Sequence, residues 1–251
     1  MNKEMKIFIS HSKEDLPFVQ PIVELFESMG ITPLNMFCSS MANYDIPLGG
    51  NIFNYLRNQF QNYDLRVIYV LSQNYYKSAF SLNEMGAAWV LGSKYNCILL
   101  PHFSIKDVRG VVDQMNIYIE LGANNNEVKY RIDELKNIIV DEFGLTTYQA
   151  VWERYRDSFL EKIKSTYLYW EQVQNITKMN GPHTELIIPL KKLIEINPIN
   201  YDAMYILGTI YADIGDKNNA IINLQTVANN CSDDEMKYKA KIILKDMGYI
   251  I

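Results

Sequence analysis

A single carboxylate stands in an otherwise uncharged stretch of this sequence. Between Ser78 and Ser93, Glu84 is the only ionisable residue. If the stretch is helical, Phe80 and Ser81 precede Glu84 by four and three residues and share its face. An aromatic ring, a hydroxyl and a carboxylate on one face suit the recognition of a sugar. Glu84 is therefore the first candidate for a functional residue.

The same residues also allow a purely structural interpretation. Ser81-Leu-Asn-Glu84 has the spacing of a capping box, in which a serine and a glutamate bond backbone N–H groups at a helix start. Carboxylates away from the surface are uncommon, however, and they gather at functional sites. Both interpretations stay open on the motif alone.

Motifs for common catalytic and nucleotide sites are absent from the sequence. It contains no GxxxxGK[ST], no GxGxxG after the first predicted strand and no GxSxG. These absences exclude a standard P-loop, a Rossmann dinucleotide site and a nucleophile elbow. The three histidines, His11, His102 and His183, show no ligand spacing. We therefore expect no metal.

Composition and charge describe a globular chain without a polyanionic partner. Hydrophobic residues make up 48% and charged residues 21% of the 251 residues, and the net charge is -5. The longest uncharged apolar stretch, Met85 to Leu91, is far shorter than the roughly 20 residues that span a bilayer. Ile7 to Ile9 is too short for a secretory signal. Three widely separated cysteines fit no disulfide framework. We expect a cytoplasmic protein that binds neither nucleic acid nor membrane.

The first half of the chain alternates short apolar runs with helical patterns, which predicts an α/β fold with a central parallel sheet. Predicted strands cover residues 6–10, 31–38, 65–71 and 97–101, and predicted helices cover residues 12–30, 52–60 and 127–143. Pro33 places the second strand at an edge of the sheet. Ser12 and Asp15 have a capping-box spacing at the start of the first helix.

The second half is predicted to be entirely helical. Apolar residues recur every three or four positions over residues 147–176, which indicates one helix about 45 Å long. The last segment resembles the tetratricopeptide repeat at Ala203, Leu207, Gly208, Tyr211, Gly215, Asp216 and Ala220, after Asn197-Pro198. We predict three parts: a domain over residues 1–146, a connecting helix over 147–178 and a tetratricopeptide-like region over 179–251.

Three ordered motifs resemble those of the Toll/interleukin-1 receptor (TIR) domain. They are Ile7-Phe-Ile-Ser-His-Ser12 with Asp15, Asp45-Ile-Pro-Leu-Gly49, and Phe80-Ser-Leu-Asn-Glu84 continued by Met85-Gly-Ala-Ala-Trp89. The resemblance covers roughly residues 3–145. It implies a flavodoxin-like sheet that binds ligands at the carboxyl ends of its strands.

Many TIR domains cleave the bond between nicotinamide and ribose in NAD+, and the resemblance assigns Glu84 as the catalytic residue. Departure of neutral nicotinamide leaves an oxocarbenium-like ribose, which an adjacent carboxylate can stabilise. The reaction needs no metal and no cofactor, since NAD+ is the substrate. The expected substrate-binding residues are Ser10, His11, Asp45, Phe80, Ser81 and Phe103.

Some alternatives stay open within this assignment. The family's Trp-Cys pair is Phe80-Ser81 here, which keeps an aromatic face but removes the thiol. Phe103 either shields the intermediate from water and favours cyclic ADP-ribose, or is a core aromatic. His11 and His102 also fit exposed positions at strand ends. We expect an NAD+ glycohydrolase in antiviral defence that self-associates through its TIR domain and helical tail. The alternative is a non-enzymatic adaptor.

Overall fold

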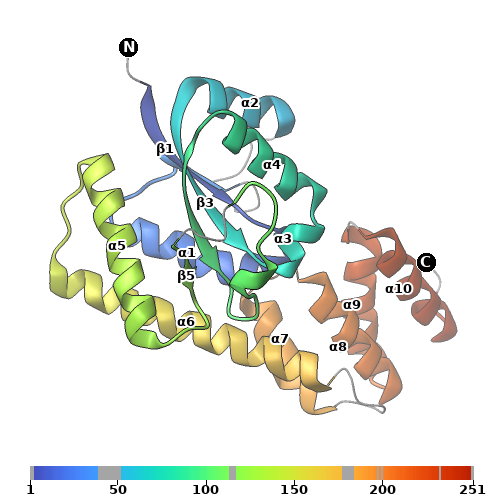
Figure 1. The fold of residues 1–251 in the computed structure, drawn as a ribbon. Helices are drawn as coiled ribbons and strands as arrows, with labels where there is room; N and C mark the ends of the chain where they lie inside the picture. Colours follow the sequence, from blue (N-terminus) through green and yellow to red (C-terminus); the bar gives the residue numbers. More distant parts are fainter. Residues whose placement is uncertain are drawn as a thin grey trace. The chain divides into compact units, whose positions relative to one another are not determined.

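The computed structural model describes residues 3–38, 52–112, 117–176, 184–196, 198, 200–231 and 233–249. The chain forms two compact units, Met1–Ile163 and Lys164–Ile251. The first unit contains the sheet and the helices that cover it, and the second is helical (Figure 1). Within the described ranges, no helix combines the length and the apolar character that a bilayer crossing requires.

The first unit is built on one five-stranded parallel sheet, with strand order β2-β1-β3-β4-β5. The strands are β1 (Glu4–Ser10), β2 (Met36–Phe37), β3 (Tyr63–Leu71), β4 (Lys94–Leu99) and β5 (Ile119–Glu120). This is the flavodoxin-like order of a doubly wound sheet. The predicted fold class is confirmed, and β2 lies at an edge as Pro33 indicated. Strand β5 was not predicted, since only two residues pair there.

Helices cover both faces of this sheet. They are α1 (Leu16–Ser28), α2 (Ile52–Asn62), α3 (Gln73–Lys77), α4 (Ala79–Val90), α5 (Asn125–Phe143) and α6 (Gln149–Ile176). Phe8 and Val67 belong to the same core as Leu56 of α2 and Met85 of α4. On the other face, Ile98 of β4 and side chains of α1 and α5 line one small space. Because both faces are buried, β1 and β3 read as continuous apolar runs.

The start of the first helix differs from the prediction. A short 3-10 turn, Lys13–Asp15, precedes α1, and Ser12 makes no capping hydrogen bond there. The capping-box prediction for Ser12 and Asp15 is therefore wrong. The Asp15 carboxylate, 1% exposed, instead accepts hydrogen bonds from the Ser72 hydroxyl and, at 2.8 Å, from the Asn74 amide. Burial removes Asp15 from water, so it takes its donors from the segment that follows β3.

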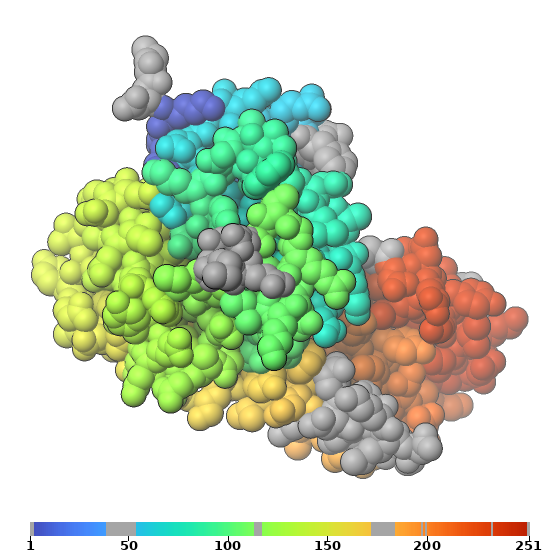
Figure 2. Space-filling view, in the orientation of Figure 1, coloured from blue at the N-terminus to red at the C-terminus, as the bar shows by residue number. Residues whose placement is uncertain are grey.

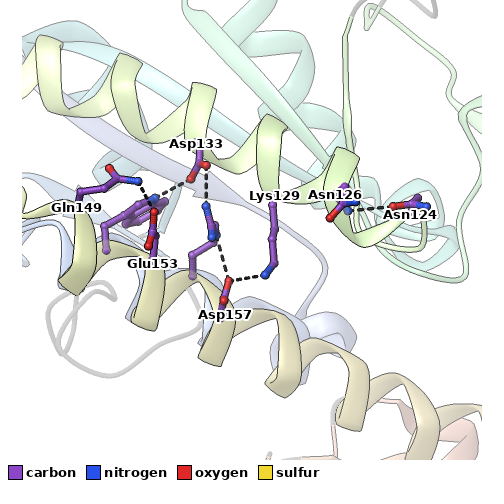
Figure 3. A network of polar contacts seen from close by, with 9 residues as sticks. Asn124, Asn126, Lys129, Asp133, Gln149, Glu153 and Asp157 are labelled. Carbon is purple, nitrogen blue, oxygen red and sulfur yellow. Dashed lines mark hydrogen bonds and ion pairs between the residues drawn. The ribbon is translucent and has the colours of Figure 1, made fainter.

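A polar network joins α6 to α5 within the first unit (Figure 3). Asp133 accepts a hydrogen bond from the Trp152 indole N–H at 2.6 Å and forms an ion pair with Arg156 at 2.6 Å. Asp157 continues the network to Arg156 at 3.2 Å and to Lys129 at 2.9 Å. These contacts and the buried Trp152 hold the first part of α6 in this unit. The compact unit therefore extends to Ile163. The predicted bounds of the three parts, 1–146, 147–178 and 179–251, stay predictions.

Replacing Asp133 with alanine is expected to lower the free energy of unfolding by about 1–3 kcal/mol. The buried Trp152 indole N–H and the largely buried Arg156 then lose an acceptor, and an unsatisfied buried donor costs about that much. Chemical denaturation measures the change. The control is Glu134→Ala, which removes an exposed ion pair with Arg131 and is expected to cost less than about 0.5 kcal/mol. Equal losses in the two variants would contradict this account.

The second unit contains the helices α7 (Ile187–Ile196), α8 (Tyr201–Asp213), α9 (Lys217–Asn230) and α10 (Asp234–Asp246). Leu207 and Tyr211 of α8 are buried in its core. A Cβ atom added to Gly208 would lie 2.7 Å from Leu224 Cγ, so α8 and α9 pack closely because residue 208 has no side chain. The helical C-terminal region is confirmed. Its likeness to a tetratricopeptide repeat stays a prediction, and Asn197 lies outside the described residues.

Candidate active site

Glu84 lies inside α4 and does not cap it. The helix begins at Ala79, and the Ser78 hydroxyl caps it by accepting a hydrogen bond from Ser81 N at 3.2 Å. Ser81 in turn donates its hydroxyl proton to the His11 carbonyl oxygen at 3.1 Å. The capping-box interpretation of Ser81 and Glu84 is therefore wrong. With its capping role excluded, the Glu84 carboxyl is available for other contacts.

The carboxyl group of Glu84 is buried and only partly satisfied. It is 4% exposed, and its Oε2 atom lies 2.7 Å from Ser10 Oγ, within hydrogen-bond distance. Within the part of the chain that the structure describes, its other oxygen, Oε1, is buried without a hydrogen-bond partner. Burial raises the pKa of Glu84 to about 8, although the Ser10 hydroxyl acts in the opposite direction. A carboxyl group with such a pKa changes its protonation close to neutral pH, as acid–base and charge-stabilising groups of active sites do.

A third side chain completes the surroundings of Glu84. The Tyr75 hydroxyl lies 2.9 Å from Ser10 Oγ and donates to the Ser81 carbonyl oxygen at 3.0 Å. Tyr75 lies in α3, which Ser72 caps by accepting from Tyr75 N at 2.9 Å. The carboxyl end of β1 therefore meets α3 and α4 in one buried polar cluster. Tyr75 was not predicted from the sequence, although its position just after β3 is a signal for this edge of the sheet.

A cavity of about 370 Å³ opens beside Glu84. Helices α2 and α4 adjoin at the surface around it, in cyan and blue-green in Figure 2. The residues that line it are Leu56, Arg57, Phe60 and Gln61 from α2, and Phe80, Asn83, Glu84, Ala87 and Leu91 from α4 and its end. Its walls are mostly apolar, with one guanidinium and one carboxyl group. This size and lining are typical of small-molecule sites.

Comparison with known proteins identifies the domain that carries this site. Residues 7–129 match the family model described as "TIR domain". This part of the chain is a TIR domain. The match includes Ser10, Tyr75 and Glu84, so the whole polar cluster belongs to it.

One relative matches a longer part of the chain than the family model does. The uncharacterized protein YddK of Bacillus subtilis (strain 168) is 35% identical over 161 residues, which is 64% of this chain. The match covers 58% of the relative, so the chain spans less than two thirds of its length. Its name states no activity, and the function of the TIR domain must be argued from the site.

The structure brings some of the predicted site residues together and leaves others apart. Phe80 lines the cavity beside Glu84, and both Ser10 and Ser81 belong to the polar cluster around it. Phe103, 7% exposed, is packed in the core, with its ring stacked on Tyr76 at 5.6 Å between centroids, and it does not line the cavity. The structure thus places Phe103 as a core aromatic of the TIR domain, one of the two interpretations of this residue.

His11 is not an exposed residue at a strand end, contrary to that alternative. It is buried, with its Nδ1 atom 3.3 Å from the Ile9 carbonyl oxygen and 3.8 Å from Cys38 Sγ. Burial lowers the pKa of His11 to about 4, so the ring is neutral at physiological pH. Asp45 and the rest of the Asp45–Gly49 loop lie outside the described residues. Substrate contacts by His11 and Asp45 stay predictions.

Metal binding finds no support in the part of the TIR domain that the structure describes. Among the described residues, no group of three His, Cys, Asp or Glu side chains could hold a metal ion.

Proposed function

We propose that the TIR domain cleaves the bond between nicotinamide and ribose in NAD+, with Glu84 as its catalytic residue. The observation that supports this most is the buried Glu84, which is one of the residues that line a cavity of about 370 Å³ and whose Oε1 has no hydrogen-bond partner among the described residues. Nicotinamide leaves as a neutral molecule, and the ribose becomes an oxocarbenium-like cation. An ionised carboxylate beside this cation stabilises it.

The apolar walls of the cavity strengthen this effect. Phe60 and Phe80 line the space together with Glu84. A charge interacts more strongly when water is excluded, because the local dielectric constant is lower. Aromatic rings also offer a stacking surface for the flat nicotinamide ring. The product is ADP-ribose if water attacks the ribose, or cyclic ADP-ribose if the adenine of the same molecule attacks.

Arg57 is suited to bind the diphosphate of NAD+, since it is exposed on α2 and lines the same cavity as Glu84. Replacing Arg57 with alanine is expected to raise the KM for NAD+ about tenfold, which corresponds to the loss of one charge-assisted contact. Cleavage of nicotinamide riboside, which has no phosphate, is expected to change less than about twofold. Steady-state release of nicotinamide from both substrates measures the difference.

The control for this prediction is Arg154→Ala, which removes an exposed guanidinium on α6 away from the cavity. It is expected to leave the KM for NAD+ unchanged. If Arg57→Ala impaired both substrates equally, Arg57 would have no role in binding phosphate.

The test of the function itself is incubation of the purified full chain with NAD+, followed by chromatography for nicotinamide. We propose that the protein self-associates through its TIR domain and helical tail, so the assay is run at low and high protein concentrations. Mass spectrometry then separates ADP-ribose from its cyclic isomers. Absence of nicotinamide at every concentration would contradict the proposal.

A second candidate function is that of a non-enzymatic adaptor in a protein assembly. The observation that favours it is the group of exposed apolar side chains at the end of α4, Trp89, Val90 and Leu91. We propose that either activity serves antiviral defence in the cytoplasm. A Glu84→Gln variant that protects cells as well as the wild type does would favour the adaptor over the enzyme.

A further inference from the structure

Three short contacts join the Ser81 carbonyl oxygen, Tyr75, Ser10 and Glu84 in one buried line. Tyr75 Oη lies 3.0 Å from the Ser81 carbonyl oxygen and 2.9 Å from Ser10 Oγ. Ser10 Oγ lies 2.7 Å from Glu84 Oε2. All three distances are within the range of hydrogen bonds between oxygens. Each hydroxyl group, however, has only one proton to donate.

Counting these protons constrains the state of Glu84. A carbonyl oxygen only accepts, so the contact with Ser81 takes the proton of Tyr75. The contact between Ser10 and Tyr75 then takes the proton of Ser10. The third contact is a hydrogen bond only if its proton comes from Glu84. With an ionised Glu84, two protons serve three contacts, and one contact between buried oxygens is left without a hydrogen bond.

We propose that Glu84 is a neutral carboxylic acid in the free protein and that Tyr75, acting through Ser10, is the positioning residue that keeps it so. The proton of Glu84 then lies on Oε2 and is donated to Ser10. Oε1, which has no hydrogen-bond partner among the residues that the structure describes, becomes the carbonyl oxygen of the acid. An unpartnered neutral oxygen costs much less to bury than one that shares a full negative charge. This inference deepens the proposed function and rests on it for the catalytic role of Glu84.

The other groups around Glu84 are compatible with this state. From β3, the Tyr69 hydroxyl approaches the same helix and donates to the Met85 carbonyl oxygen at 3.5 Å. From α2, Arg57 shares the cavity, where its exposed guanidinium is in contact with water. His11, which follows β1, is neutral. Burial, which raises the pKa of Glu84 to about 8, acts in the same direction as the proton count.

This state has a consequence for the proposed reaction. Glu84 must lose its proton to solvent before it can stabilise a cationic ribose. The nicotinamide ring of NAD+ carries a positive charge, which favours the ionised carboxylate when the two are close. Once Glu84 is ionised, Ser10 donates its proton to Oε2 and its hydrogen bond to Tyr75 changes direction or is lost. Substrate binding and release of one proton are therefore linked.

The test measures the protonation of Glu84 directly, without substrate. Infrared difference spectra of the full-length wild type minus Glu84→Gln isolate the carboxylic acid band of Glu84, and a pH titration gives its pKa. We expect the acid form to predominate at pH 7. In Tyr75→Phe, the neutral form loses two hydrogen bonds and the ionised form loses one. The pKa of Glu84 is therefore expected to fall by roughly half to one pH unit.

Two comparisons separate positioning from a general disturbance of the fold. Tyr76→Phe removes the neighbouring hydroxyl, which donates to the Arg109 carbonyl oxygen at 3.1 Å, and is expected to leave the pKa of Glu84 unchanged. In a Ser10→Ala background, Tyr75→Phe is also expected to have no effect, because Tyr75 acts through Ser10. An effect of equal size in that background would overturn the proposed chain of contacts.

The outcomes also distinguish this inference from the proposed function. An ionised Glu84 in the wild type at pH 6.5 would overturn the inference, whether or not Tyr75→Phe folds. Nicotinamide release with an unchanged pKa in a folded Tyr75→Phe would also overturn it and leave the enzymatic function standing. The expected spectra without any nicotinamide release would support the protonated Glu84 and reject the proposed function.

Discussion

Replacing Glu84 with glutamine is expected to slow the release of nicotinamide from NAD+ by about a hundredfold to ten-thousandfold. Glutamine has the same shape as glutamic acid but cannot become negative, so it removes the charge that stabilises the ribose cation. Because Glu84 is proposed to be neutral in the free protein, the substitution is also expected to leave the fold intact. Chromatographic assays at several protein concentrations measure the rate.

The unfolding temperature of Glu84→Gln and the activity of a second Glu→Gln variant show whether a slower reaction comes from the loss of the Glu84 charge. Glu84→Gln is expected to unfold at or slightly above the wild-type temperature, since it buries no group that must be kept neutral. Glu127→Gln makes the same chemical change at an exposed position in the first turn of α5 and is expected to keep full activity. Normal nicotinamide release by a folded Glu84→Gln variant would reject the catalytic role.

The stability of the protein is expected to fall as the pH rises from about 4 to about 7, to the extent that Asp15 controls it. Burial raises the pKa of Asp15 from 3.8 to about 7, even though Ser72 and Asn74 donate hydrogen bonds to its carboxylate. In this window the folded protein retains a proton that the unfolded chain has released, so raising the pH favours unfolding. At about 1.4 kcal/mol per pH unit, the contribution reaches roughly 2–4 kcal/mol.

Comparison of variants isolates this contribution from that of other groups. In Asp15→Asn, the free energy of unfolding is expected not to fall over this pH range, because no carboxyl group is left at residue 15 to titrate. In Ser72→Ala, the decline is expected to continue to higher pH, since the hydroxyl that favours the charged form is gone. Denaturant titrations between pH 4 and 8 measure both profiles. Parallel profiles for the wild type and Asp15→Asn would contradict the assignment.

Local patterns in the sequence were sufficient for much of the fold and for part of the site. The apolar runs predicted β1 and β3, because strands buried on both faces contain few polar residues. Helical spacing predicted that Phe80 and Glu84 share a face, since residues four apart do so, and both residues line one cavity in the structure. These features depend on residues that are close together in the chain.

The features that the sequence analysis missed depend on contacts between distant segments. Tyr75 meets Glu84 only because α3 and α4 both lie at the carboxyl end of β1, and Arg57 shares the cavity because α2 lies beside α4. The two capping boxes failed for different reasons. Asp15 took donors that follow β3, and Ser78 lay closer to the true start of α4 than Ser81 did. Tertiary burial outweighed local spacing at Asp15, whereas at α4 another serine three residues earlier was the cap.

Ser72 and Tyr75 lie between Asp15 and Glu84, which are both buried. The Ser72 hydroxyl donates to Asp15 and accepts from the backbone N–H of Tyr75, whose side-chain hydroxyl reaches Ser10 next to Glu84. Polar contacts at the backbone and at the hydroxyl of Tyr75 therefore connect the two acids through this one residue. Substitutions at Asp15 and at Glu84 each change the free energy of unfolding. These two changes are not expected to add up to the change in the double variant, because residues in one network of contacts are energetically coupled.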